Sequence, residues 1–358
     1  MIYHLLTSLA GEYTFLNVFR YLTFRGVVAA LLALIVSLFF GPRLLRVLRA
    51  GQVRQVISEF APEGHAAKQG TPTMGGVLIL ASLLLSVFLV ADLSNIYVLL
   101  TTAVITGYGA IGAVDDYLKI TQGKNAGLRA RTKLLWQFII AGAAISVLYS
   151  RPEFNSVLSI PFMKEGNPDL GLFYIPFATL VVVGASNAVN LTDGLDGLAI
   201  GPVMTTAATY AILAYAAGHA KIAGYLLITP IPGAGELMIV CAAMATASLG
   251  FLWFNTYPAQ MFMGDVGALA LGGALGMVAV ISKNELVLLI AGGIFVVEAL
   301  SVIIQIGSIK LRGKRVFRMA PIHHHFELKG WPEPLIIVRF WIISVICALV
   351  ALATLKLR

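Results

Sequence analysis

Charged residues are scarce in this chain. Asp, Glu, Lys and Arg make up 12% of its 358 residues, and hydrophobic residues make up 59%. Soluble globular domains carry about 25% charged residues, and the mean hydropathy here is +0.89. The composition therefore excludes a soluble protein and indicates an integral membrane protein. The connections between its apolar runs are short, so no soluble domain is left over.

Cysteine is also rare. The chain has two, Cys241 and Cys347, and both lie inside apolar runs. Buried thiols of this kind usually pack in a protein core, which argues against a disulfide or a cysteine metal site. The N-terminus lacks a basic start followed by a cleavage site, so the sequence predicts no removable signal peptide. We expect the first turns of the chain to form an interfacial helix.

Apolar runs recur from end to end, and a run of about 17–25 apolar residues can cross a bilayer. Lipid tolerates only helices and closed barrels. The sequence therefore predicts an all-α, polytopic membrane protein with ten transmembrane helices in a single domain, residues 1–358. The first and fourth runs are short, so their helices must recruit flanking residues. The predicted spans are 26–40, 73–91, 96–114, 134–149, 170–189, 198–217, 237–254, 266–281, 286–309 and 335–355.

Lys and Arg gather in the connections after the first, third and ninth runs. The connections that face the other way hold only Arg151, Lys164, Lys221 and Lys283. The positive-inside rule then places the odd-to-even connections in the cytoplasm and both termini outside, in the periplasm. This distribution explains the formal charge of +8 better than nucleic-acid binding does, and it offers a basic surface to anionic lipid and phosphate.

Four polar clusters border the apolar runs, all on the predicted cytoplasmic side: Asp115-Asp116, 187–197, 255–265 and 321–325. In the second cluster Asn187, Asn190, Asp193 and Asp196 recur every third residue, so they share roughly one face if the segment stays helical. Acidic groups beside a membrane suggest a charged ligand, most simply a phosphate held through a divalent metal. Four clusters at one membrane face predict one site.

Each cluster also has a structural explanation. Asp115-Asp116 fits a solvated helix end near Lys119. Thr192 or Asp193 fits a helix cap, and so does Asp265. The three histidines at 323–325 fit a plain surface loop as well as a phosphate-contacting or acid/base role. Zinc binding is disfavoured, because consecutive histidines point in different directions and no Cys or His lies at a suitable spacing.

Glu298 stands apart, near the middle of the ninth run. An unpaired carboxylate is costly at that depth, so we expect a polar partner, a groove or a protonated state. Asp92, Glu236 and Glu285 are interpreted as ordinary outer-edge charges.

Four motifs resemble one family: Asp115-Asp116-Tyr117, Asn190-Leu-Thr-Asp-Gly-Leu-Asp-Gly197, Phe254-Asn-Thr-Tyr-Pro-Ala-Gln-Met-Phe-Met-Gly-Asp265 and Ala320-Pro-Ile-His-His-His-Phe-Glu-Leu-Lys-Gly-Trp331. The chain is similar over its whole length to the phospho-N-acetylmuramoyl-pentapeptide-transferases (MraY family). They are a bacterial branch of the polyprenyl-phosphate N-acetylhexosamine-1-phosphate transferase superfamily. The acidic motifs are shared across the superfamily. The histidine motif and Thr71-Pro-Thr-Met-Gly-Gly76 are specific to the branch.

The resemblance implies a Mg²⁺-dependent enzyme that converts UDP-N-acetylmuramoyl-pentapeptide and undecaprenyl phosphate into lipid I and UMP. It implies that Asp265 binds Mg²⁺, that Asp115 acts as base or positions the acceptor beside Asp116, and that the histidines contact phosphates or sugar. The implied catalytic residues are Asp115, Asp116, Asp265, His323, His324 and His325. The implied substrate surface comprises Lys68, Thr73, Asn190, Asp193, Gly194, Leu195, Asp196, Asn255 and Phe262, with uracil against 194–196 and Phe262 stacking.

The implied location is the bacterial cytoplasmic (inner) membrane, with the active site facing the cytoplasm. Membrane lipids are expected partners, a homodimer is expected, and nucleic acid is not. For the lipid tail, the ninth run with Gly292-Gly293 and Glu298 is a candidate for the bent wall of a groove.

Two rival functions remain open at this point. A sister transferase that moves N-acetylglucosamine-1-phosphate shares the acidic motifs, and only the histidine loop and its neighbours argue against it. A secondary transporter usually has a site at mid-bilayer and repeated halves. Here the acids lie at one face and no convincing repeat is found.

Overall fold

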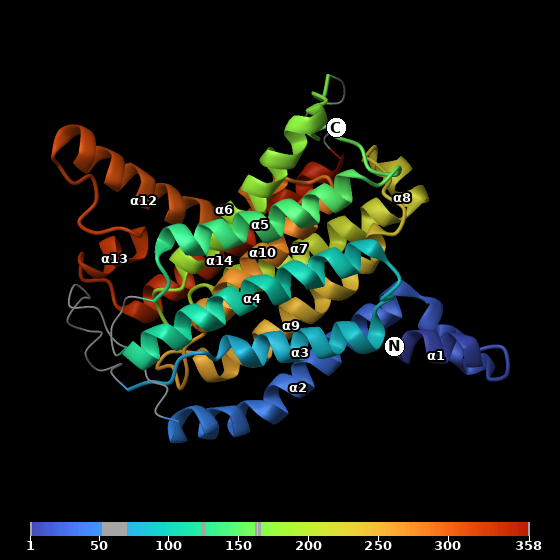
Figure 1. Ribbon diagram of the computed structural model, residues 1–358, viewed down its shortest axis with the longest axis horizontal. Coiled ribbons are helices and arrows are strands. Elements are labelled where there is room, and N and C mark those ends of the chain that lie inside the picture. Colours follow the sequence, from blue (N-terminus) through green and yellow to red (C-terminus); the bar gives the residue numbers. More distant parts are fainter. Residues whose placement is uncertain (1, 52–69, 123–126, 162, 164–165, 357–358) are drawn as a thin grey trace.

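The computed structural model describes residues 2–51, 70–122, 127–161, 163 and 166–356, and over these residues the protein is all-helical (Figure 1). Strand-like pairing among them is limited to isolated bridges, one of which joins Val157 and Asp169. The helices are α1 (Ile2–Leu9), α2 (Leu22–Ala50), α3 (Gly76–Val90), α4 (Ile96–Gln122), α5 (Ala130–Tyr149), α6 (Tyr174–Thr192), α7 (Ile200–Gly218), α8 (Ala220–Leu226), α9 (Leu237–Asn255), α10 (Gly264–Ile281), α11 (Val287–Ala291), α12 (Gly293–Arg312), α13 (Ile322–Glu327) and α14 (Glu333–Ala353).

Nine helices in the described part of the chain are long and apolar enough to cross a membrane: α2, α4, α5, α6, α7, α9, α10, α12 and α14. The protein is therefore a multi-pass membrane protein, as the sequence predicts. The second predicted span, 73–91, forms α3 with only 15 residues. At 1.5 Å per residue this is about 22 Å, shorter than the ~30 Å hydrocarbon layer.

The late start of α3 is explained by hydrogen bonds to the loop that precedes α10. The Gly75 N–H donates to the Phe262 carbonyl at 2.8 Å, and the Gly76 N–H donates to the Met263 carbonyl at 2.8 Å. Met74 adopts a positive φ of 69°. The segment before α3 is thus held in a non-helical path by a loop nearly two hundred residues away in sequence.

Other helix ends also differ from the predicted spans. The short first and fourth runs recruit flanking residues, as expected, and become α2 and α5. The third run continues to Gln122, so Asp115 and Asp116 lie inside α4 and not at its end. The ninth run is broken at Gly292 into α11 and α12. Figure 1 shows α12 leaning away from the bundle.

The core of the bundle is α10. Every residue from Val266 to Ile281 is buried, and many of them are Gly or Ala. A Cβ atom at Gly272 would lie 2.6 Å from the Ala185 carbonyl oxygen, and one at Gly276 would lie 2.7 Å from the Val182 Cα. Small residues of this kind let helix backbones approach closely in a membrane, where apolar burial alone gives no preference for protein over lipid.

Figure 1 places α1 and both labelled chain ends at one end of the bundle, opposite α13. At the α1 end, the interpretation of Glu236 and Glu285 as ordinary edge charges is wrong. Arg25 donates to both Glu236 carboxylate oxygens, one of them at 2.9 Å, in a buried ion pair. The Tyr174 hydroxyl donates to the buried Glu285 carboxylate. Buried charges require such partners, and the partners come from helices distant in sequence.

Candidate active site

Three carboxylates from two helices meet at the α13 end of the bundle. Asp115 and Asp116 come from α4 and Asp265 from the first turn of α10, and one oxygen of each lies within 4.8 Å of the others. Asp115 and Asp116 are only 2% and 3% exposed. Closely spaced carboxylates repel one another, so the cluster needs a compensating cation or hydrogen-bond donors.

Close backbone contact between α4 and α10 sets the geometry of this cluster. A Cβ atom at Gly112 would lie 2.3 Å from the carbonyl oxygen of Asp265. Asp116 Oδ2 accepts a hydrogen bond of 3.2 Å from the Val266 N–H, which satisfies one of the free donors at the start of α10. Gly264, at a φ of +73°, lies against Asp116 and Thr73, since a Cβ there would be 2.4 Å from Asp116 Oδ2 and 3.1 Å from Thr73 Oγ1.

Two lysines offset part of the acidic charge. Lys119 Nζ lies 2.6 Å from Asp115 Oδ2 and 3.2 Å from Asp265 Oδ2. Lys133, at the start of α5, contacts Asp265 directly. The other Asp115 oxygen accepts from the Leu128 N–H at 2.8 Å. The sequence did not single out either lysine as a site residue. The four-residue spacing from Asp115 was a signal for Lys119, but Lys133 carried none beyond its place in a basic connection.

The second polar cluster does not form one helical face. Helix α6 ends at Thr192, so Asp196 lies beyond it, while Asn190 lies half-buried in its last turn. Asn187 serves packing: its amide donates to Gln137 Oε1 at 2.9 Å and to the Val183 carbonyl. Asn187 therefore belongs to a polar contact between α5 and α6.

Asp193, at the end of α6, shares the electrostatic environment of the cluster. Desolvation, followed by the like charges of Asp265, Asp116 and Asp196, raises the pKa of Asp193 to about 8.

The loops after α6 and α9 are joined to each other. Asp196 Oδ2 accepts from the Ala259 N–H at 2.9 Å, and the Asn255 amide donates to the Met261 carbonyl at 2.9 Å. Leu195 is buried with Leu198 in a hydrophobic cluster against α12 and α14. Phe262 is half-buried, and its N–H donates to the Pro72 carbonyl at 2.7 Å.

The three histidines of α13 have three different environments, as expected for consecutive positions. His323 is 0% exposed, with Nδ1 3.1 Å from Glu298 Oε1. His324 Nδ1 lies 2.6 Å from Glu327 Oε2. His325 Nδ1 accepts from the Arg318 N–H at 3.1 Å. The polar partner expected for Glu298 is thus His323.

The structure therefore brings together residues of all four predicted clusters. One oxygen of each of Asp115, Asp116 and Asp265 lies within 4.8 Å of the others, and Thr73 and Asp116 both lie against Gly264. The charges of Asp116 and Asp265 raise the pKa of Asp193, and Asp196 accepts a hydrogen bond from Ala259. Gly194 lies against His323, because a Cβ there would be 2.2 Å from Nε2. Lys68 lies outside the described residues.

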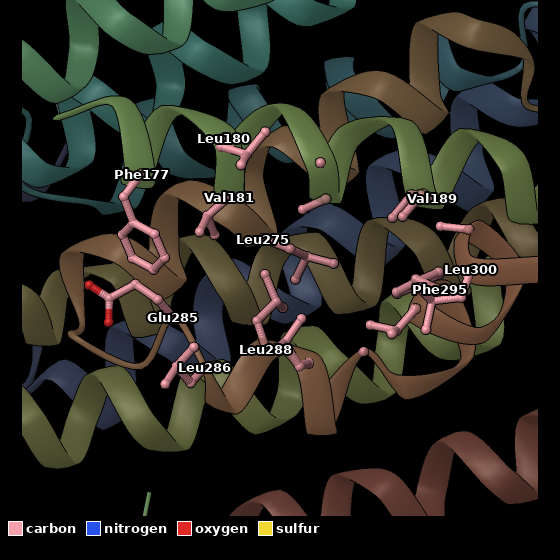
Figure 2. A pocket seen from close by; sticks show the side chains of 17 residues that line it. Phe177, Leu180, Val181, Val189, Leu275, Glu285, Leu286, Leu288, Phe295 and Leu300 are labelled. Carbon is pink, nitrogen blue, oxygen red and sulfur yellow. The ribbon is translucent and has the colours of Figure 1, made fainter. Parts of the chain in front are cut away.

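An apolar cavity of about 310 Å³ lies between α6, α10, α11 and α12. Figure 2 shows Leu180 and Val189 along one side and Leu288 and Phe295 along the other, with the Glu285 carboxylate at one end of the lining. The Val189 end of the cavity adjoins Asn190 and the last turn of α6, which leads to Asp193. The cavity therefore extends from the neighbourhood of the polar site along the membrane-spanning helices.

Comparisons with known proteins point to one family. Residues 95–283 match the model of glycosyl transferase family 4, and residues 68–80 match phospho-N-acetylmuramoyl-pentapeptide-transferase signature 1. The chain is 59% identical to the phospho-N-acetylmuramoyl-pentapeptide-transferase of Pelobacter propionicus over 358 residues, which is 100% of both chains. It is 58% identical to the proteins of the same name from Citrifermentans bemidjiense and a Geobacter species, again over 100% of both chains.

Replacing Gly112 with alanine tests the backbone contact that positions Asp265. Alanine favours a helix by up to about 1 kcal/mol over glycine, but overpacking costs about 1–3 kcal/mol. The backbone of Asp265 cannot rotate away, so we expect Gly112→Ala to lower the free energy of unfolding, measured by thermal unfolding in detergent. In the control Gly142→Ala, the new Cβ meets only Thr179 Oγ1 at 3.9 Å, so no loss is expected. Equal stability of the two variants would show that the contact is not tight.

Proposed function

The chain belongs to the phospho-N-acetylmuramoyl-pentapeptide-transferase family, and on that premise we propose how its site performs the family's reaction. The enzyme transfers phospho-N-acetylmuramoyl-pentapeptide from UDP-N-acetylmuramoyl-pentapeptide to undecaprenyl phosphate, and gives lipid I and UMP. The observation that carries the assignment to this site is the buried Asp115–Asp116–Asp265 cluster with its two lysines. One substrate is a soluble nucleotide and the other a lipid with its phosphate at the interface, so both can reach a site at the end of membrane helices.

We propose ten membrane spans, with α3 as the tenth, and both termini outside the cytoplasm. Two observations support this topology: the concentration of Lys and Arg in three connections, and the position of both labelled chain ends opposite α13 (Figure 1). The site would then face the cytoplasm, where the nucleotide substrate is made, in the inner membrane of a bacterium. The homodimer stays a prediction.

The carboxylate cluster fits a magnesium ion. Hard divalent cations take oxygen ligands, and the three oxygens of Asp115, Asp116 and Asp265 are close enough to share one ion. We propose Asp265 as its principal ligand. When bound, Mg²⁺ offsets the charge of the pyrophosphate and lowers the barrier to phosphoryl transfer. Lys119 and Lys133 supply further positive charge to the substrate phosphates.

For the nucleotide, we propose the surface formed by the loops after α6 and α9. The Asp196–Ala259 hydrogen bond supports this, because it holds the two loops together. The side chains of Leu195 and Asp196 are buried, so we expect backbone groups of this loop to contact uracil, with Phe262 stacking on the base. We propose that Asn190, Asp193, Asn255 and Thr73 belong to the same binding surface, and that His324 and His325 contact phosphates or sugar.

We propose direct transfer without a covalent enzyme intermediate. An oxygen of the lipid phosphate attacks the β-phosphorus of the nucleotide, and the bond from that phosphorus to the UMP oxygen breaks. One phosphoanhydride is exchanged for another, so the energy of the reaction needs no ATP. Phosphoryl transfer depends mainly on positioning and charge neutralisation, which the aspartates and lysines of this chain provide.

Asp115 has an organising role in this scheme. One of its oxygens accepts from Leu128 and the other contacts Lys119. A phosphate monoester has a second pKa of about 6, so the acceptor is largely dianionic at neutral pH and needs no base. We expect Asp115→Asn to lose activity at every pH, measured as a pH–rate profile. Full recovery at high pH would contradict this and make Asp115 the base.

The transferase function is tested by UMP release from purified protein in detergent. We expect release with UDP-N-acetylmuramoyl-pentapeptide and undecaprenyl phosphate, loss of release on addition of EDTA, and recovery on addition of excess Mg²⁺. Release with UDP-N-acetylglucosamine instead would indicate the sister transferase. Because no transport is possible in detergent, any release reports turnover. No release with either donor would refute the transferase.

We propose that the cavity between α6 and α12 holds the first part of the lipid tail. Its lining is apolar except for Glu285, and burial of each CH₂ group is worth about 0.8 kcal/mol. Glycines at the bend are poor test positions: a Cβ at Gly293 would lie 2.9 Å from Cys347 Sγ, and one at Gly292 would lie 2.9 Å from the Leu288 carbonyl. Gly184 lines the cavity and has nothing within 4 Å of a Cβ.

Gly184→Leu should therefore fill the cavity without straining the helix. If the new side chain displaces two methylene groups of the lipid, at about 0.8 kcal/mol each, the KM for the lipid should rise about tenfold or more. The KM for the nucleotide should not change. Gly307→Leu is the matched control, because Gly307 has no neighbour within 4 Å and does not line the cavity. A change confined to the nucleotide KM would dismiss the cavity as the lipid site.

A further inference from the structure

Glu298 and His323 form a pair that the transfer chemistry does not use. Glu298 lies in α12 and His323 in α13, and both are 0% exposed. Their nearest polar atoms, Nδ1 and Oε1, are 3.1 Å apart. Within the described residues, neither ring nitrogen of His323 and neither carboxylate oxygen of Glu298 makes an aligned hydrogen bond, so the two side chains are in close contact without one. A carboxylate at this depth is costly without a partner, so each group depends on the other.

The opposite edge of the imidazole lies against the loop that follows α6. A Cβ atom on Gly194 would be 2.2 Å from His323 Nε2. Only glycine permits this approach, and Gly194 directly follows Asp193. Leu195 of the same loop packs with Ile294 of α12 and Ile336 of α14. The imidazole thus fills the space between α12 and the loop.

We infer that Glu298 is a positioning residue for nucleotide binding and acts through His323. The carboxylate 3.1 Å from Nδ1 holds that edge of the ring against α12. The opposite edge of the ring, at Nε2, then packs against the Gly194 backbone and so sets the position of the 193–196 loop. This inference rests on the proposed role of that loop in binding the nucleotide.

Loss of the Glu298–His323 contact can be distinguished from a general distortion of α12, because different residues of α12 face the two substrates. Phe295, Val296, Ala299 and Leu300 of α12 line the apolar cavity, and Glu298 is not part of that lining. A distorted α12 would therefore disturb the lipid, whereas a lost Glu298–His323 contact would disturb the nucleotide.

The test measures both KM values by UMP release for Glu298→Leu and Glu298→Gln. Leucine removes the carboxylate that contacts His323, and we expect the nucleotide KM to rise by about 10–100-fold, as for a misplaced substrate contact, with the lipid KM unchanged. Glutamine keeps an acceptor oxygen and should restore most of the affinity. In a His323→Ala background, Glu298→Leu should add little, because the two residues act as a unit.

Glu236→Gln is the matched control, because Glu236 is another buried carboxylate, paired with Arg25 at the α1 end of the bundle and outside both proposed substrate sites. It should leave the nucleotide KM unchanged. With an active wild type, an unchanged nucleotide KM in Glu298→Leu, an equal rise in both KM values, or additive effects with His323→Ala would each overturn the inference. A wild type that releases no UMP would refute the proposed function itself.

Discussion

The contact between the backbones of α4 and α10 is the constraint on which the rest of the site depends. Gly112 lets the start of α10 approach until no side-chain atom fits between the helices. Asp116 then reaches the Val266 N–H, and Asp265 lies beside Asp115. Because backbone atoms in packed helices cannot change rotamer, the distances between these carboxylates are set more rigidly than side-chain packing alone would set them.

The same packing explains why a cluster of acids is stable in this position. Burial and mutual repulsion both destabilise ionised carboxylates. They are stabilised here by Lys119 and Lys133 and by the backbone N–H donors of Leu128 and Val266. Each donor is a fixed part of a helix start or a neighbouring turn. The site therefore holds a high density of opposite charges near hydrocarbon, which is the environment that a pyrophosphate and a cation need in order to bind together away from bulk water.

Sequence reasoning succeeded where the signal is local and failed where it depends on distant partners. Apolar runs predict membrane helices, and the polar clusters that interrupt them predict one end of the bundle as the site. The start of α3 was missed because it is set by hydrogen bonds to Phe262 and Met263. Lys133 and the Arg25–Glu236 pair were missed for the same reason, since no spacing in a single sequence shows which residues from different helices will meet.

In the proposed scheme, one break in the chain, at the start of α12, serves two substrates. At Gly292 the helix changes direction, and the apolar cavity then lies along α12 while Glu298 reaches His323 in α13. A straight ninth helix would continue the line of α11 and could not lean away from the bundle as α12 does (Figure 1). Since the proposed lipid cavity and the proposed support for the nucleotide loop share this helix, the break has to satisfy both. This requirement explains a costly buried charge in an otherwise apolar segment, because an apolar residue at Glu298 would leave the His323 imidazole buried without a partner.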